Sequence, residues 1–225
     1  MTHSAQELLD GIRTAIADGH GVNRFVPLVA EGRAPLASIG ALAAEESRIV
    51  PADWRSFLAL AARADDPAGR AFFTTLAQGE GSVLPLVAPL AAAAGFDEAA
   101  VRDHRPEPAC QAYAAFVAWL ASNAAPAVAA VALLTNFAAF GGYCAAIADG
   151  LRAHYGFADE AVAFFDFFAA PAPDLARQGL AAVQAGLDAG VPFDRAVEYA
   201  RLLQGYELMF WNALADSAAD PAEAG

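Results

Sequence analysis

Near the C-terminus of this chain of 225 residues, positions 204–214 read QGYELMFWNAL. The stretch belongs to a proline-free run, 193–216, in whose first half charged residues recur three positions apart. This spacing marks one face of an α-helix. Because each residue turns a helix by about 100°, Glu207 lies about 180° around the helix from Glu198. The run therefore predicts a helix on which Glu207 points toward the core.

The environment of this glutamate raises a question about function. Its neighbours on the same helical face are Leu203, Phe210, Trp211 and Leu214, all apolar. A buried charge costs several kcal/mol unless it is paired, hydrogen-bonded or neutralised. Glu207 is either a buried, functional carboxylate, which we favour, or a residue at the margin of the charged face whose head reaches water.

The composition predicts the fold class. Hydrophobic residues make up 57% of the chain, and alanine, the strongest helix former, dominates them. No run alternates convincingly with the period of two that a strand requires. We therefore expect an all-α helical bundle, organised as a single domain over 1–225, with about 216–225 frayed. The length is ample for a substantial core.

Charge and cysteine content narrow the classes of partner and compartment. The net charge of −13 at pH 7 repels phosphate backbones, so we expect no nucleic-acid partner. Two isolated cysteines, Cys110 and Cys144, and an N-terminus without signal-peptide character indicate the cytoplasm. The uncharged stretch 111–148 is interrupted by polar residues and proline, so we expect a buried hairpin of the bundle and no membrane span.

Prolines and glycines predict where the helices begin and end. The sequence "DHRPEP", 103–108, reads as a linker or a turn between helices, and "GEGS" at 79–82 reads as a break. The predicted helices are 5–18, a short helix or turn within 24–32, and 35–50, 51–64, 70–78, 83–94, 109–123, 126–154, 158–169, 173–189 and 193–216.

A second acid repeats the pattern of Glu207. Glu46 shares its helical face with apolar side chains such as Leu42 and Ile49, whereas Glu45 shares its face with Ser38, Ala41 and Arg48. We predict that Glu46 faces inward and Glu45 outward. Two inward carboxylates from distant helices could bind and protonate a polar ligand, provided that burial or mutual repulsion raises one pKa. The alternative for Glu46 is a surface position near a helix end.

Aromatic residues could complete a pocket around these acids. The run Phe164–Phe168 surrounds a helix, so at least one ring faces inward, and Tyr113 and Phe140 lie on two other predicted helices. Planar heterocycles are commonly bound between such rings, although each ring alone could equally be ordinary core. Asn136, an amide in an apolar run, needs a partner, either a ligand or another helix.

Other constellations that carry chemistry are missing from the sequence. The histidines His3, His20, His104 and His154 share no helical spacing with carboxylates, so we expect no metal centre. There is no GxSxG, no P-loop and no GxGxxG, and we expect no cofactor. A buried, unreactive thiol is the expectation for Cys144.

Four stretches together resemble the TenA/thiaminase II and PqqC superfamily, whose members share the all-α haem-oxygenase-like fold. "NRFVPLVAEGRAP" is similar to the opening HPFVxxLxxGxLP, and "PEPACQAYAAFVAWL" to PxPxxxxYxxxM. "VALLTNFAAF" resembles AALLPCxxxY, and "YELMFWNAL" resembles the closing YExxFWxxA. The matches run in order from about residue 20 to 215. The resemblance implies that Glu46 contacts a pyrimidine, that Tyr113 stacks on it, and that Glu207 is catalytic.

Departures from the family pattern affect the chemistry. This chain has Asn136 at the position of the nucleophilic cysteine of thiaminase II, and Phe140 at the position of a family tyrosine. An amide cannot attack as a thiolate does. The metal-binding and PqqC-like relatives carry a pattern like HxxxDxxH. The corresponding positions of this chain are Ala170, Asp174 and Arg177, so both histidines are replaced.

The leading expectation is an enzyme that hydrolyses an exocyclic group of a thiamin-related aminopyrimidine, with Glu207 acting as general acid and base. The alternatives are a non-catalytic binding protein and a PqqC-like oxygen-dependent enzyme. The resemblance also implies a homo-oligomer, a dimer or a tetramer. The expected site comprises catalytic Glu207 and the substrate-binding residues Glu46, Tyr113, Asn136, Phe140, Phe164, Phe168 and Tyr206.

Overall fold

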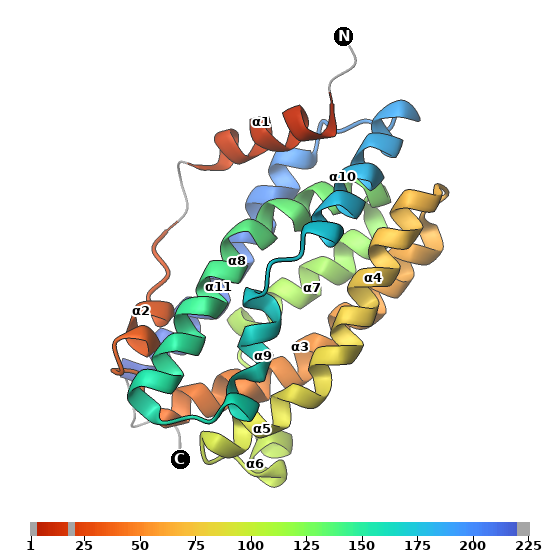
Figure 1. Cartoon of the computed structure of the whole chain (residues 1–225). Helices are drawn as coiled ribbons and strands as arrows, with labels where there is room; N and C mark the ends of the chain where they lie inside the picture. The colour runs from red at the N-terminus through yellow and green to blue at the C-terminus, as the bar shows by residue number, and fades with distance from the viewer. Residues whose placement is uncertain (1–3, 18–20, 220–225) are drawn as a thin grey trace.

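The computed structural model describes residues 4–17 and 21–219. These residues form helices and no strand, which confirms the all-α prediction (Figure 1). The helices are α1 (Ala5–Ala17), α2 (Phe25–Ala30), α3 (Leu36–Arg63), α4 (Pro67–Val83), the 3₁₀ helix η1 (Leu84–Leu86), α5 (Val87–Ala93), α6 (Glu98–Asp103), α7 (Pro108–Asn123), α8 (Pro126–Tyr155), α9 (Asp159–Ala169), α10 (Pro173–Asp188) and α11 (Ala196–Ala219).

Six of the longer helices form a closed ring of neighbours. Helix α3 packs on α4, α4 on α10, α10 on α8, α8 on α11, α11 on α7, and α7 on α3 (Figure 1). Helix α9 packs against α8 and α5 at one end of the ring, and α2 packs against α8. Because every helix has two ring neighbours, side chains from segments distant in the sequence can meet inside the ring.

Local sequence explains most of the helix ends. Proline stands in the first turn of α4, α7, α8 and α10, where its missing N–H is not needed. The carboxylate of Asp66 accepts a hydrogen bond from the amide of Gly69 at the start of α4. Gly156, at φ 69°, ends α8 in the left-handed conformation that glycine adopts without strain.

Two predicted breaks do not exist. Pro51 lies inside α3, which continues to Arg63, so the separate helices predicted at 35–50 and 51–64 are one. The "GEGS" break is wrong too, because α4 passes through Gly79 and Gly81 to Val83. Glycine costs a helix about 1 kcal/mol per residue and an interior proline about 3 kcal/mol. Packing of α3 and α4 on each other and on α7 and α10 outweighs these local costs.

Two segments differ from prediction in a smaller way. The region predicted as one helix over 83–94 is the 3₁₀ turn η1 followed by α5, and a short helix, α6, follows that was not predicted. Helix α11 continues to Ala219, so positions 216–219 of the expected frayed tail are helical, and the remainder of that tail lies outside the described residues. Position 18 of the predicted opening helix also lies outside them.

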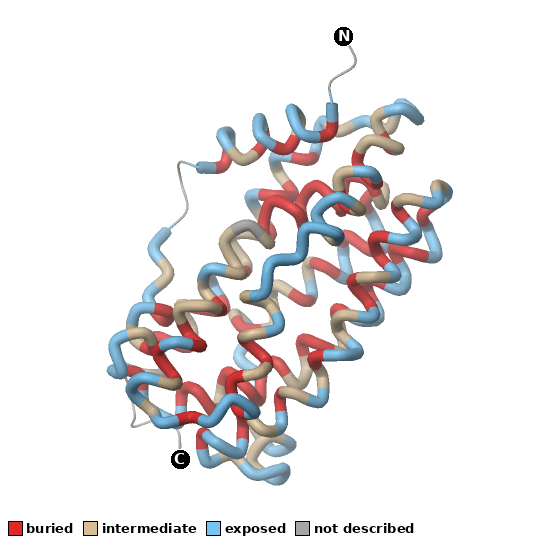
Figure 2. Tube along the Cα trace, viewed as in Figure 1, coloured by how far each residue is buried: buried red, intermediate tan, exposed pale blue. Residues whose placement is uncertain are grey.

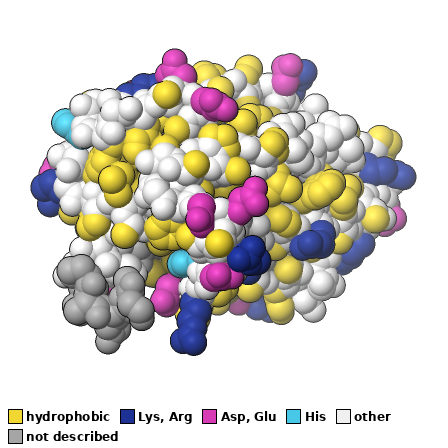
Figure 3. Space-filling view, turned by 90° about the horizontal axis from the view of Figure 1, so that it is seen from below, with side chains coloured by type: hydrophobic (Ala, Val, Ile, Leu, Met, Phe, Trp, Pro, Cys, Tyr) yellow, Lys and Arg dark blue, Asp and Glu magenta, His cyan; other side chains and the backbone are white. Residues whose placement is uncertain are grey.

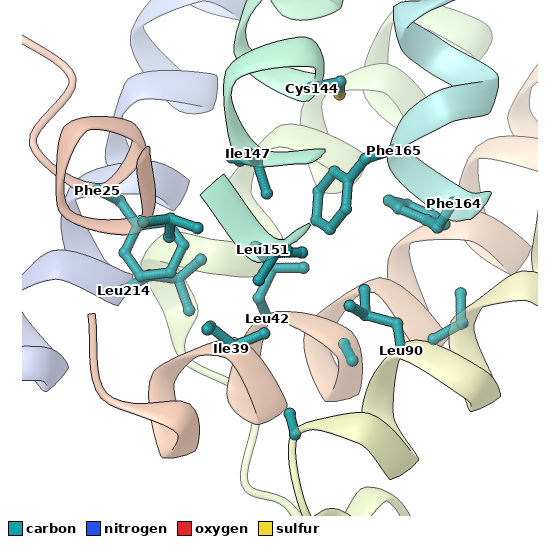
Figure 4. Close-up of a cluster of buried hydrophobic side chains, with 14 of the residues drawn as sticks. Phe25, Ile39, Leu42, Leu90, Cys144, Ile147, Leu151, Phe164, Phe165 and Leu214 are labelled. Carbon is teal, nitrogen blue, oxygen red and sulfur yellow. The ribbon is translucent and has the colours of Figure 1, made fainter. Parts of the chain in front are cut away.

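The core consists of two groups of buried side chains. One lies where α2, α3, α5, α8, α9 and α11 meet and includes Phe25, Leu151, Phe164 and Leu214 (Figure 4). The other is centred on Phe57, Phe72 and Phe73 with residues of α7 and α8. Along the ring helices, buried and exposed residues alternate, as expected for helices that pack on one face and meet solvent on the other (Figure 2).

Helix α8 is the one described helix long and apolar enough to cross a membrane by length and composition. Residues 129–133 of α8 have no exposed surface, and the helix contacts α2, α9, α10 and α11. It therefore packs as a buried member of the helical ring. On the end of the molecule seen from below, acidic and basic side chains lie beside one another with hydrophobic side chains between them (Figure 3).

Candidate active site

The ring of helices surrounds a cavity of about 840 Å³ that is partly open to solvent. Its lining comes from α3, α4, α7, α8, α9, α10 and α11, with Arg13 of α1 and the segment 170–172 between α9 and α10. Both core groups contribute to the walls, for example through Phe57 and Phe210. The polar side chains of interest in the lining are Glu46, Asp53, Glu80, Tyr113, Asn136 and Glu207.

Glu207 is buried on the cavity wall, with 3% of its surface exposed. Its Oε1 accepts a hydrogen bond from Trp211 Nε1 at 2.9 Å, one turn further along α11. Its Oε2 accepts from Gln204 Nε2 at 3.1 Å and from the amide of Asn136. Burial raises the pKa of Glu207 to about 7, although the three donors favour the ionised form. The group can therefore both accept and release a proton near neutrality.

Asn136 connects Glu207 to a third helix. The amide nitrogen of Asn136 on α8 donates to Glu207, and its carbonyl oxygen accepts from the Tyr113 hydroxyl of α7 at 3.2 Å. A carboxylate cannot donate, so the NH₂ group of Asn136 must face Glu207. Burial, followed by nearby carboxylates, raises the pKa of Tyr113 well above its usual value, and the hydroxyl stays protonated. The partner that Asn136 needs is thus supplied by the protein on both sides.

Glu46 also lies on the cavity wall and is 7% exposed. Its pKa is raised to about 8, mainly by burial and then by the nearby charges of Asp53 and Glu45. Glu46 and Glu207, from α3 and α11, therefore line one partly open and largely apolar cavity.

Two acids on the cavity wall were missed by sequence reasoning. Asp53 follows Glu46 by seven residues, or two turns of α3, and is 5% exposed. Burial raises its pKa to about 8. Glu80 of α4 lines the same space, and burial raises its pKa well above the usual value. Asp53 was missed because a new helix was predicted to start at 51, so its two-turn spacing from Glu46 was not considered. Glu80 was missed because a break was predicted at 79–82.

The aromatic residues divide between the cavity and the core. Tyr113, Phe140 and Phe168 line the cavity, with the rings of the last two 5.2 Å apart and nearly perpendicular. Phe164 does not line it and is 1% exposed in the core, although its ring is 5.3 Å from that of Phe168.

Tyr206 does not line the cavity either, because it faces Phe116 of α7, with ring centroids 5.2 Å apart. Sequence reasoning could not separate these cases, because the run "FFDFF" presents rings to every side of α9. Phe57, Phe137, Phe167 and Phe210 also line the cavity and were not among the expected site residues.

The prediction that Glu45 faces outward is wrong. Glu45 is 1% exposed, and its Oε1 lies 2.9 Å from His104 Nε2 and accepts from the backbone amide of Glu107 at 2.7 Å. Its Oε2 accepts from the side-chain amide of Gln111. The segment between α6 and α7 folds back over α3 and covers this face. A helical wheel shows which residues share a face and does not show what covers it.

The positions that correspond to the metal pattern of PqqC-like relatives lie apart. Ala170 lines the cavity, whereas Asp174 and Arg177 are exposed on α10 and form an ion pair at 2.7 Å. Within the described residues, no three His, Cys, Asp or Glu side chains are placed to hold a metal ion. His3 and His20 lie outside those residues. Cys144 is buried, and burial raises its pKa well above the usual value, so its thiol is neutral.

Solved structures with the same architecture come from several microorganisms. A TenA homologue from P. horikoshii OT3 has a TM-score of 0.67 at 17% identity, covering 94% of this chain and 98% of that one. A domain of unknown function with a heme oxygenase-like fold from Shewanella denitrificans OS217 has a TM-score of 0.74 at 14% identity, covering 98% and 93%. A TenA family transcription regulator from Silicibacter sp. TM1040 has a TM-score of 0.69 at 14% identity, covering 95% and 97%.

These likenesses establish the haem-oxygenase-like fold. A search of the curated proteins finds no match to the sequence. The sequence profile of the TENA/THI-4/PQQC family matches residues 14–217, which include every helix that lines the cavity from α3 to α11. The chain therefore belongs to the TENA/THI-4/PQQC family.

Proposed function

We propose that this protein hydrolyses an exocyclic group from a thiamin-related aminopyrimidine, with Glu207 as the general acid and base. The proposal rests on the environment of Glu207. Its carboxylate is buried on the wall of a cavity of about 840 Å³ and is oriented by three hydrogen-bond donors. Burial raises its pKa to about 7. Membership of the family supports a pyrimidine as the ligand.

In the proposed reaction, water replaces an amine on the exocyclic carbon of the pyrimidine. The ionised carboxylate of Glu207 takes a proton from the water as its oxygen forms the new C–O bond. The C–N bond breaks, and Glu207 returns the proton to the leaving nitrogen. A pKa near the working pH suits both steps, because the same group must be a competent base and then a competent acid. No thiolate is needed at position 136.

The remaining lining residues would position the ring. Glu46, whose pKa of about 8 keeps it largely protonated at neutral pH, can donate to a ring nitrogen and accept from the exocyclic amino group. Tyr113, Phe140 and Phe168 can contact the faces of the heterocycle. Asn136 would act as a positioning residue, because it holds the Glu207 carboxylate in one orientation.

The test is the release of amine from an aminomethyl-substituted aminopyrimidine, followed by chromatography, for wild type, Glu207→Gln and Glu198→Gln. Glu198 is a partly exposed acid on the same helix and pairs with Arg195 at 2.6 Å, so it is a matched control. We expect Glu207→Gln to lower kcat by about 10²–10⁴-fold and Glu198→Gln to leave it unchanged. Equal rates for Glu207→Gln and wild type would remove Glu207 from the mechanism.

One observation favours a second candidate function, that of a non-catalytic binding protein. Both oxygens of Glu207 already accept hydrogen bonds from the protein, so the carboxylate could serve only to organise the pocket. A binding protein would be stabilised thermally by the aminopyrimidine and would leave it unchanged. Turnover by wild type that depends on Glu207 excludes this candidate.

A further inference from the structure

We propose that the side of the cavity formed by α3 and α4 is a binding site for a protonated amine of the ligand, held by Asp53 together with Glu46 and Glu80. The site lies in the same cavity as the proposed hydrolysis and rests on that function only in sharing its ligand. It concerns charge recognition, and Glu207 takes no part in it.

The first observation is an unpartnered buried acid. Asp53 lines the cavity and is 5% exposed, and its Oδ1 has no hydrogen-bond partner among the residues that the structure describes. Buried polar side chains in native proteins are almost always hydrogen-bonded. Because Oδ1 itself has almost no accessible surface, a donor from a ligand in the cavity would approach this unpaired carboxylate from its other oxygen.

The second observation is the placement of two further acids beside Asp53. Glu46 lies two turns earlier on α3, and Glu80 projects from α4, which packs along α3. Charge repulsion from Asp53 contributes to the raised pKa of both groups. No hydrogen bond or ion pair within the described part of the chain reaches either of these carboxylates.

The buried acids outside this group differ from it in their hydrogen bonding. Glu45 and Glu207 each receive three hydrogen-bond contacts from their own chain. The chain thus supplies donors to two of its buried carboxylates and leaves the α3–α4 group without any. We therefore expect the acids of the α3–α4 group to take their donors from a ligand, whereas the donors of Glu45 and Glu207 hold those two carboxylates in a fixed orientation.

No basic side chain of the described lining neutralises this group. Arg13 borders the cavity, but its guanidinium donates to Asp10 at 3.3 Å and to the backbone oxygen of Leu134 at 3.5 Å. The positive charge would therefore come from the ligand. Within the described residues no three acids converge on one point, so an ammonium would be hydrogen-bonded by Asp53, with Glu46 and Glu80 contributing negative charge nearby.

Proton exchange provides a signature for this site. In the empty cavity at pH 7, pKa values of about 8 keep Asp53 and Glu46 mainly protonated. A bound cation stabilises the ionised carboxylate and lowers its pKa. Binding of a protonated amine should therefore release protons to the buffer, whereas binding of a neutral ligand of the same shape should not. The other titratable groups of the described lining are Glu80, Tyr113, Glu207 and Arg13.

The experiment compares benzylamine with benzyl alcohol, which share a ring and differ in charge, by ligand-observed NMR and by calorimetry in two buffers of different ionisation enthalpy. We expect wild type at pH 7 to bind the amine about tenfold more tightly and to release protons with the amine alone. Asp53→Asn should remove this preference and the proton release, and Glu80→Gln should weaken both. Asp174→Asn, an exposed acid of α10, is the control and should retain them.

Three results would overturn the proposal: equal binding of the two probes to wild type, equal weakening of both probes by Asp53→Asn, or stabilisation of wild type by MgCl₂ that Asp53→Asn removes. Thermal unfolding of each variant establishes that it is folded, and Glu80→Gln provides a second test should Asp53→Asn fail to fold. Glu207→Gln should keep the amine preference while losing turnover. Failure of the hydrolysis proposal is thereby distinguished from failure of this one.

Discussion

The side-chain amide of Asn136 on α8 donates a hydrogen bond to the carboxylate of Glu207 on α11. The carbonyl of the same amide accepts from Tyr113 on α7. Three neighbouring helices of the ring are thus joined by polar contacts on the cavity wall. The contact matters for chemistry, because it orients the carboxylate and favours its ionised form against the effect of burial.

Substitution of Asn136 by alanine should raise the pKa of Glu207 above its present value of about 7, because one of the three donors that stabilise the ionised carboxylate is lost. The ascending limb of the pH profile of kcat/KM should then move to higher pH by about one unit. Asn123→Ala, at the exposed end of α7, is the control and should leave the profile unchanged. A profile that stays in place in Asn136→Ala would show that the amide does not tune Glu207.

Asn136→Cys should introduce one thiol that reacts with iodoacetamide in the native protein, because position 136 opens onto the cavity and lies beside the carboxylate of Glu207, which can take the thiol proton. The native cysteines, Cys110 and Cys144, are buried with raised pKa values and serve as internal controls. Mass spectrometry should show one added carbamidomethyl group in the variant and none in wild type. Labelling of neither protein would contradict the accessibility of this position.

Asp53→Asn should increase the free energy of unfolding at pH 8 by about 1–3 kcal/mol, because it removes a carboxylate that is buried without a partner. The pKa values of Asp53, Glu46 and Glu207 are raised in the folded protein, so the folded state binds more protons than the unfolded one. Stability from these groups is fully present below about pH 4 and is lost as pH rises to about 8.

Urea titrations at pH 5 and pH 8 measure this effect. Wild type should lose stability between the two values, and Asp53→Asn should lose less of it. The exposed control Asp174→Asn should follow wild type. A variant that is less stable than wild type at pH 8 would contradict the interpretation of Asp53 as an unsatisfied acid.

Glu45→Gln should lower the stability of the protein and Glu46→Gln should not, although the two residues are adjacent. Glu45 accepts hydrogen bonds from the backbone of Glu107 and the side chain of Gln111, and a glutamine would turn an NH₂ group toward at least one of these donors, lowering the free energy of unfolding by about 1–3 kcal/mol. Glu46 has no such donors, and Glu46→Gln should be neutral or stabilising at pH 8. Each variant is the control for the other in chemical denaturation, and the same sign for both would refute this distinction.

Much of the site follows from patterns along single helices. The inward direction of Glu207 follows from its position opposite the charged face of α11, and the need of Asn136 for partners follows from its apolar surroundings. Glu45 and Tyr206 could not be placed in this way, because their surroundings come from α7 and the segment before it, which are distant in sequence from both residues and reach them only after folding. Asp53 and Glu80 were missed because a local proline and local glycines suggested breaks that packing overrode.

Helix formation, the apolar faces of the helices and the presence of acids on two of those faces are encoded locally, through propensity and a period of 3.6 residues. The tertiary structure alone placed α3, α4, α7, α8 and α11 around one cavity and so determined which acids meet, which are satisfied by the protein and which are left without donors. The physical reason is that burial and hydrogen-bond partners, which set the pKa of each carboxylate, are properties of neighbouring helices and not of the helix that carries the residue.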